Sequence, residues 1–282
     1  MNEKIKTARL SIFSNISLIV IKLLAGLISG SVSIISEAIH SGMDLLASII
    51  AFLSVKMSDS PPDREHPYGH GKFENISGVV EAVLIFIAAG WIIYEAIHKI
   101  IKPTAIENIE IGVAVMAVSA VVNFFISRKL YMVAKRTDSI ALEADALHLK
   151  TDVYTSVGVA VGLFLIWLTG WHFLDPIVAI SVAILILKES YTLLRNAYSP
   201  LLDASLSPEE NLIIEEVLQK RGLAFHNLRT RKSGQYRFAD LHLEMPENIS
   251  LKNVHGLCDE IEDEIKSKIN HIEIQIHVEP VP

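Results

Sequence analysis

Six long apolar runs in the first 200 residues constrain the fold of this 282-residue chain more than any other feature. Hydrophobic residues make up 51% of the chain, and its mean hydropathy of +0.40 is too high for an ordinary soluble domain of this size. A membrane-spanning helix needs about 20 consecutive, mostly apolar residues. The sequence therefore predicts an all-α domain of six transmembrane helices, at residues 10–30, 34–57, 73–100, 109–134, 140–168 and 174–198.

The basic residues predict how these helices are oriented. An even number of spans places both termini on the same side of the membrane. With the N-terminus inside, most Lys and Arg residues of the loops and helix ends fall on the inner side, and only Lys99 and Lys102 fall on the outer side. Because cytoplasmic loops carry an excess of Lys and Arg, we expect a multi-pass protein of the cell (inner or plasma) membrane with both termini in the cytoplasm.

Residues 203–282 have the composition of a soluble domain and follow the transmembrane domain of residues 1–202. Ser207 and Pro208 predict the start of a helix that ends near Lys220. A second helix is expected at 250–268, and strands are expected at 223–231, 236–245 and 271–278. We therefore predict a cytoplasmic α+β domain. Its acidic residues outnumber its basic ones, which argues against nucleic acid as a partner.

Two copies of a His-x3-Asp motif lie inside the apolar runs. His40 and Asp44 form the first copy, His148 and Asp152 form the second, and the flanking residues repeat as well. A spacing of four places both side chains on one helix face. Ionisable groups at bilayer depth are costly and are kept mainly where they face a partner or a water-filled path. One copy alone could form a hydrogen bond between helices. Two copies supply two imidazoles and two carboxylates, which suit a tetrahedral divalent cation, with zinc as the first candidate.

The polar loop between the second and third spans offers a second group of ligands. Asp63, His66 and His70 lie within one eight-residue stretch of a proline-containing segment. Carboxylates and imidazoles are ligands of zinc and similar ions. The alternative is a solvated polar loop without a metal ion.

Histidines also come from several predicted elements of the C-terminal domain. His242 and His277 alternate with apolar residues along their strands, so both are expected to point away from the core of the sheet. From this periodicity alone, isolated surface histidines are the simpler interpretation.

Together these features resemble the cation diffusion facilitator family, and in particular its bacterial zinc/proton antiporter branch. The resemblance covers nearly the whole chain. It rests on the six spans, the paired His-x3-Asp motifs, the Asp-x2-His-x3-His loop and the C-terminal domain. It implies a ferredoxin-like fold for that domain and a homodimeric protein.

The resemblance also implies roles for individual residues. The transport site would consist of His40, Asp44, His148 and Asp152. A loop site would consist of Asp63, His66 and His70. A two-metal site that stabilises the dimer would lie in the cytoplasmic domain, at His226, His242, His255, His277 and Glu279. Lys72 and Asp203 match a charge pair that joins spans across the dimer in relatives.

We therefore expect a secondary active transporter, and not an enzyme, that exports Zn²⁺ from the cytoplasm in exchange for protons. Zn²⁺ would be both cargo and regulator, and Cd²⁺, Fe²⁺ and Co²⁺ remain alternatives. The expected partners are a second copy of the chain, the lipid bilayer, divalent metal ions and protons.

Two rival functions are weighed against transport. A membrane-anchored metal sensor would leave the intramembrane quartet without a task. An intramembrane zinc hydrolase would keep an open metal position for water, whereas four converging ligands close the coordination shell.

Overall fold

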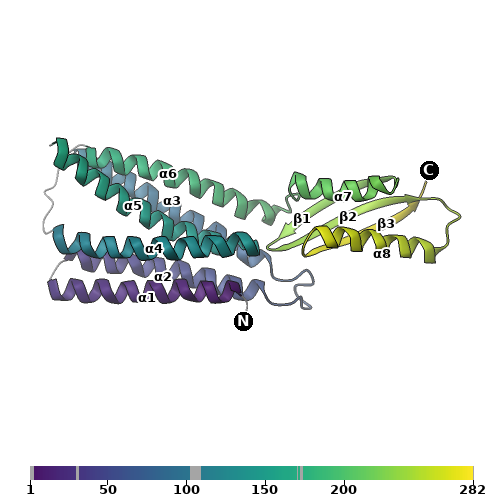
Figure 1. Ribbon diagram of the computed structural model, residues 1–282, viewed down its shortest axis with the longest axis horizontal. Coiled ribbons are helices and arrows are strands. Elements are labelled where there is room, and N and C mark those ends of the chain that lie inside the picture. Colours follow the sequence, from purple (N-terminus) through teal and green to yellow (C-terminus); the bar gives the residue numbers. More distant parts are fainter. Residues whose placement is uncertain (1–2, 30–31, 102–108, 170, 172–173, 282) are drawn as a thin grey trace.

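The computed structural model describes residues 3–29, 32–101, 109–169, 171 and 174–281. A bundle of long helices is followed by a smaller domain that contains a sheet, and the two lie end to end (Figure 1). The helices of the bundle are α1 (Glu3–Ser29), α2 (Val32–Ser58), α3 (Lys72–Ile101), α4 (Ile109–Thr137), α5 (Ile140–Thr169) and α6 (Leu174–Tyr198). The predicted six-helix all-α domain is confirmed.

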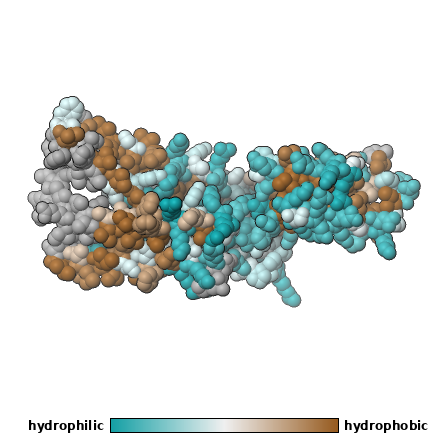
Figure 2. Space-filling view, in the orientation of Figure 1, coloured by the Kyte–Doolittle hydropathy of each residue, from teal (hydrophilic) through white to brown (hydrophobic). Residues whose placement is uncertain are grey.

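The helices of the bundle pack mainly as pairs. The most extensive contacts join α3 to α6, α1 to α2, and α4 to α5; α5 also packs against α6 and α3, and α1 packs against α4. Among the described residues, four stretches are long and apolar enough to cross a membrane, namely Glu3–Ala25, Lys72–His98, Ala117–Thr137 and Pro176–Leu202. On the face shown in Figure 2, the described residues of the bundle are mostly apolar away from the C-terminal domain and mostly hydrophilic near it.

A buried ion pair fixes the end of the bundle nearest the C-terminal domain. Lys4 Nζ lies 3.0 Å from Glu74 Oε1, and both side chains are almost fully buried. Ser139, directly before α5, donates a hydrogen bond to the same carboxylate. Helix α1 therefore begins at Glu3, before the expected residue 10, because its first polar turn has partners inside the protein. Removing one partner of a buried ion pair costs about 3–5 kcal/mol.

The smaller domain has the predicted element order of helix, strand, strand, helix, strand. Its elements are α7 (Pro208–Lys220), β1 (Phe225–Ser233), β2 (Tyr236–Met245), α8 (Leu251–Lys268) and β3 (Ile272–Pro280). A 3₁₀ turn (Ser199–Leu202) connects α6 to this domain. Helix α7 begins as expected, because Ser207 accepts from the backbone of Glu210 and the Glu210 side chain accepts from the backbone of Ser207.

The sheet has one covered face and one open face. Strand β2 is central, antiparallel to β1 and parallel to β3. The covered face packs against both helices, and its buried core includes Leu241, Leu243, Ile214, Ile261 and Ile265. Because side chains alternate along a strand, the polar residues of β2 and β3 point to the other face. This arrangement is the α+β, ferredoxin-like domain expected from the sequence.

The turn between β1 and β2 is inserted into the junction with the helix bundle. The Gly234 backbone N–H donates to Asn75 Oδ1 over 3.1 Å, and Asn75 Nδ2 donates to the Ala197 carbonyl over 3.3 Å. The backbones of Gly71 and Ser233 are so close that a Cβ on Gly71 would lie 2.2 Å from the Ser233 carbonyl oxygen. The turn therefore attaches the sheet to the start of α3 and the end of α6.

Ion pairs add a second attachment of the sheet to the bundle. Asp138, between α4 and α5, lies 2.7 Å from Lys232 Nζ and 3.0 Å from Arg237 Nη2. The Arg231 guanidinium stacks over the rings of Tyr68 and Phe238, 4.6 and 4.7 Å from their centroids. The connection between α4 and α5 and the pair of α3 and α6 thus contact the same sheet.

We predict that Gly71→Ala loosens this junction. The added methyl group has no space beside Ser233, and overpacking of this kind costs about 1–3 kcal/mol. Protease cleavage between α6 and α7, measured on the purified protein in detergent, should become faster. Gly90→Ala is the matched control, because a Cβ there meets no described atom within 4 Å. Equal cleavage of the two variants would contradict the prediction.

Candidate metal centres

The first candidate centre lies between α2 and α5, where one residue of each His-x3-Asp motif contacts the other, although the ligand atoms of Asp44, His148 and Asp152 do not all lie within 4.8 Å of one another. His148 Nε2 lies 3.1 Å from Asp44 Oδ1. Asp44 is buried, and His148 is nearly so. The described side chains of this set are those of Asp44, His148 and Asp152; the backbone of His40 is helical in α2, and its side chain lies outside the described residues.

Asp152 has a polar neighbour that the sequence analysis did not identify. Asn123 on α4 donates from Nδ2 to Asp152 Oδ2 over 3.2 Å, and Asn123 is buried. The available signal was a single amide side chain within an apolar run. Side chains that hydrogen-bond a metal ligand orient it, and their loss commonly costs 10–100-fold in metal affinity.

A buried polar cluster lies beside these ligands and joins three helices. Ser48 donates to Asp145 Oδ1 over 2.8 Å, and it also lies 3.0 Å from the hydroxyl of Ser11. Asn15 donates to Ser48 over 2.8 Å and to the Asp44 carbonyl over 3.3 Å. Buried polar groups without a partner are costly. These bonds therefore hold α1, α2 and α5 in one register next to Asp44 and His148.

The second candidate centre is in the loop between α2 and α3, as expected. Ligand atoms of Asp63, His66 and His70 all lie within 4.8 Å of one another. Asp63 lies 3.3 Å from both rings. The backbone N–H of His66 donates to Asp63 and lowers the pKa of that carboxyl, so it is ionised at neutral pH. The ring nitrogen of His70 that faces Asp63 is Nε2.

The third candidate centre is on the open face of the sheet. His226, His242 and His277 occupy paired positions on β1, β2 and β3 and form a row across the strands. Neighbouring rings have centroids 5.1 Å and 4.8 Å apart. Glu279 lies 2.8 Å from His226 Nε2 and 3.3 Å from His242 Nδ1. His226, His242 and Glu279 thus form a group that fits one metal ion.

Two residues near this centre need separate description, one outside the expected set and one within it. Glu244, which was not among the expected ligands, lies 3.1 Å from His226 Nδ1. It occupies the position paired with Glu279, two residues along from the histidine row. His255, which was expected in the set, lies on α8 and is 75% exposed, with Asp259 3.7 Å away. His255 and Glu279 line the same groove between α8 and β3.

The expected charge pair forms within one chain. Lys72 Nζ lies 2.9 Å from Asp203 Oδ1, and Arg231 lies 3.7 Å from the same oxygen. The hydrogen bond from Lys72 lowers the pKa of Asp203. The pair joins the start of α3 to the segment between α6 and α7.

The comparisons with known proteins cover both parts of the chain. Residues 8–202 match the family model for the cation efflux transmembrane domain, and residues 206–281 match the model for the cation efflux protein, cytoplasmic domain. An uncharacterized transporter of Synechocystis sp. is 36% identical over 277 residues, covering 97% of this chain and 89% of the relative. The cation-efflux pump FieF of Shewanella oneidensis is 32% identical over 276 residues, covering 97% and 93%.

Among solved structures, the metal-bound C-terminal domain of the CzcD transporter from Thermotoga maritima is 29% identical to this chain. The match covers 26% of this chain and 87% of that one, with a TM-score of 0.25. The family models and the full-length relatives place the whole chain in one family. The chain therefore belongs to the cation efflux, or cation diffusion facilitator, family, and it is a membrane transporter for the efflux of divalent metal cations.

Proposed function

We propose that this transporter exports Zn²⁺ from the cytoplasm in exchange for protons, and that His40, Asp44, His148 and Asp152 hold the ion during transport. The observation that carries the proposal is the contact between His148 Nε2 and Asp44 Oδ1, 3.1 Å apart, which joins one ligand from each motif across two helices. This contact places one ligand of each motif within reach of the same ion.

The chemistry of the four groups supports zinc as the cargo. Two imidazole nitrogens and two carboxylate oxygens form a mixed set that suits a borderline ion in tetrahedral geometry. A set made only of carboxylates would favour harder ions such as Mn²⁺. Cd²⁺, Fe²⁺ and Co²⁺ are the competing cargoes. The Asn123 amide would orient the Asp152 carboxylate toward the ion.

Proton exchange would follow from competition at the same atoms. An imidazole with an ordinary pKa of about 6.5 takes up either a proton or a metal ion near neutral pH. His148 interacts with the Asp44 carboxylate, and a protonated imidazole keeps that partner. Protons that arrive from outside would displace the ion. The helices would then turn about the site so that it can bind another cytoplasmic ion.

The orientation, the membrane and the assembly are parts of the same proposal. The Lys and Arg distribution favours cytoplasmic termini in the cell membrane, so the C-terminal domain would meet the cytoplasmic metal pool. The match of this domain to the family's cytoplasmic domain supports a homodimer. The loop centre and the open-face centre would bind regulatory Zn²⁺, with His255 and His277 as ligands of a second ion beside Glu279.

We predict that Asp152→Ala lowers Zn²⁺ flux into proteoliposomes to the background level. The substitution removes one of only four ligands and leaves a small polar void, so expression and assembly should be retained. Glu95→Ala is the matched control, because it removes an exposed carboxylate from α3. Wild-type flux from the Asp152→Ala protein would contradict the quartet assignment, and the absence of flux in the wild-type protein would favour the sensor.

We also predict that Zn²⁺ flux out of the cytoplasmic side rises when the opposite side is made more acidic. Protons would bind the imidazoles from that side and release the ion. The measurement is flux at a fixed Zn²⁺ gradient and varied pH difference, with the membrane potential clamped. Dissipating the proton gradient serves as the control. Flux that follows only the metal gradient would identify a passive uniporter and contradict proton exchange.

A third prediction concerns the open face of the sheet. His226→Ala combined with His242→Ala should remove the C-terminal portion of Zn²⁺ binding by the full-length protein, measured by calorimetry in detergent. Binding by the wild-type protein should weaken below about pH 6.5, where imidazole becomes protonated. His98→Ala is the control, because His98 is exposed on α3, far along the chain from this face. Unchanged Zn²⁺ uptake by the double variant would show that these histidines are only surface residues.

A further inference from the structure

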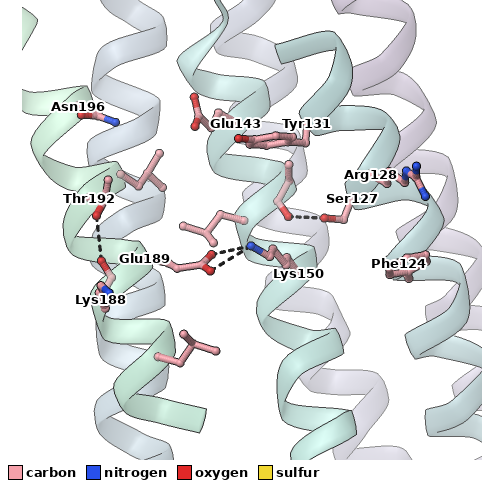
Figure 3. A pocket seen from close by; sticks show the side chains of 14 residues that line it. Phe124, Ser127, Arg128, Tyr131, Glu143, Lys150, Lys188, Glu189, Thr192 and Asn196 are labelled. Atoms are coloured by element: carbon pink, nitrogen blue, oxygen red, sulfur yellow. Dashed lines mark hydrogen bonds and ion pairs between the residues drawn. The ribbon is translucent and has the colours of Figure 1, made fainter. Parts of the chain in front are cut away.

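A surface groove of about 520 Å³ lies between α4, α5 and α6, outside the candidate metal centres. Figure 3 shows it with the Lys150 and Glu189 side chains in contact at its centre, Arg128 on one side and Lys188 on the other. It belongs to the parts of α4, α5 and α6 that lie toward the C-terminal domain (Figure 1), since α4 ends at Thr137 and α5 begins at Ile140.

The apolar part of the groove is open to the surroundings. Phe124 and Tyr131 on α4 are 49% and 50% exposed, and Leu185 on α6 is 44% exposed. These side chains belong to helices that are long and apolar enough to cross a membrane. Apolar surface of this kind, on a membrane helix, packs against lipid chains or against protein.

The carboxylates of the groove are already neutralised by lysines. Glu189 accepts from Lys150 Nζ over 2.9 and 3.1 Å and from Tyr154 over 3.3 Å. Glu143 lies 2.7 Å from Lys135 Nζ. Neither carboxylate is therefore available to balance a further cation.

Two cations of the groove have no such partner. The Arg128 guanidinium and the Lys188 ammonium line the groove and are exposed, and neither makes an ion pair with any residue that the structure describes. The groove therefore carries an excess of positive charge, on a surface whose remaining lining is largely apolar. A ligand that fits it has a negative group attached to an apolar body.

The position of the groove identifies the source of such a ligand. On the face shown in Figure 2, the described residues of the bundle are mostly apolar away from the C-terminal domain, and the surface becomes hydrophilic toward that domain. Phospholipid headgroups lie at a boundary of this kind, and a Lys or Arg near an anionic membrane surface contributes about 1 kcal/mol. A second copy of the chain would place two positively charged grooves against each other, which is unfavourable.

We propose that this groove is a binding site for an anionic phospholipid of the leaflet that faces the C-terminal domain. Arg128 and Lys188 attract its phosphate, and its acyl chains lie against Phe124 and Leu185. The bound lipid contacts α4 and α6, which belong to different helix pairs. The site is independent of the metal ligands and of the identity of the cargo.

The test uses the full-length protein in neutral detergent and native mass spectrometry with added phosphatidylglycerol or phosphatidylcholine. Phosphatidylglycerol should be retained at least tenfold more tightly by the wild-type protein. Arg128→Gln combined with Lys188→Gln should weaken its binding about 30-fold, since each cation contributes roughly fivefold. Lys6→Gln combined with Lys129→Gln is the matched control, because replacing these two exposed lysines removes the same amount of charge outside the groove.

Each other outcome would overturn the proposal. Equal binding of the two lipids, or full retention of phosphatidylglycerol by the Arg128 and Lys188 double variant, would exclude charge recognition in this groove. Displacement of the lipid by millimolar glycerol 3-phosphate would show that a free phosphate ester is recognised without its chains. Loss of dimer mass in the double variant, with lipid retained, would identify the groove as a contact between copies of the chain.

Discussion

A bilayer makes unpartnered ionisable side chains costly, and the helix bundle is organised around this constraint. His148 meets Asp44 between α5 and α2, and the buried Asp145 carboxylate accepts from Ser48. Asn15 brings α1 into the same set of bonds. Because an unsatisfied charge at this depth is costly, these polar contacts specify how the helices face one another, and the apolar residues around them fill the remaining space.

The three candidate metal centres share one arrangement, in which histidine and carboxylate side chains lie close together. Asp44 lies beside His148, Asp63 lies between His66 and His70, and Glu279 lies between His226 and His242. A contact between an imidazole and a carboxylate holds both groups near a geometry in which they could bind a metal ion. Binding of a metal ion at such a site would order few additional side chains. The affinity for the ion would fall as the pH is lowered, because the same nitrogens take up protons.

Periodicity was enough to predict the helices and strands, because long apolar runs and strict alternation leave few other structures. The repeated His-x3-Asp motif likewise predicted that α2 and α5 would face each other. The partners that depend on contacts distant in sequence could not be predicted. Asn123 approaches Asp152 only because α4 packs on α5, and Glu244 reaches His226 only through the pairing of β1 with β2. His255 was grouped with the other histidines by resemblance, but it lies on a helix, where the strand register does not determine its position.

The two attachments of the sheet to the bundle differ in stiffness. At Gly71 the contact is backbone against backbone with no free space, whereas at Asp138 it consists of partly exposed ion pairs with Lys232 and Arg237. A close-packed contact cannot shorten or slide, but exposed ion pairs lengthen at small cost. A tilt of α4 and α5 relative to the sheet would therefore lengthen the ion pairs of Asp138 before it displaced the β1–β2 turn, which stays with α3.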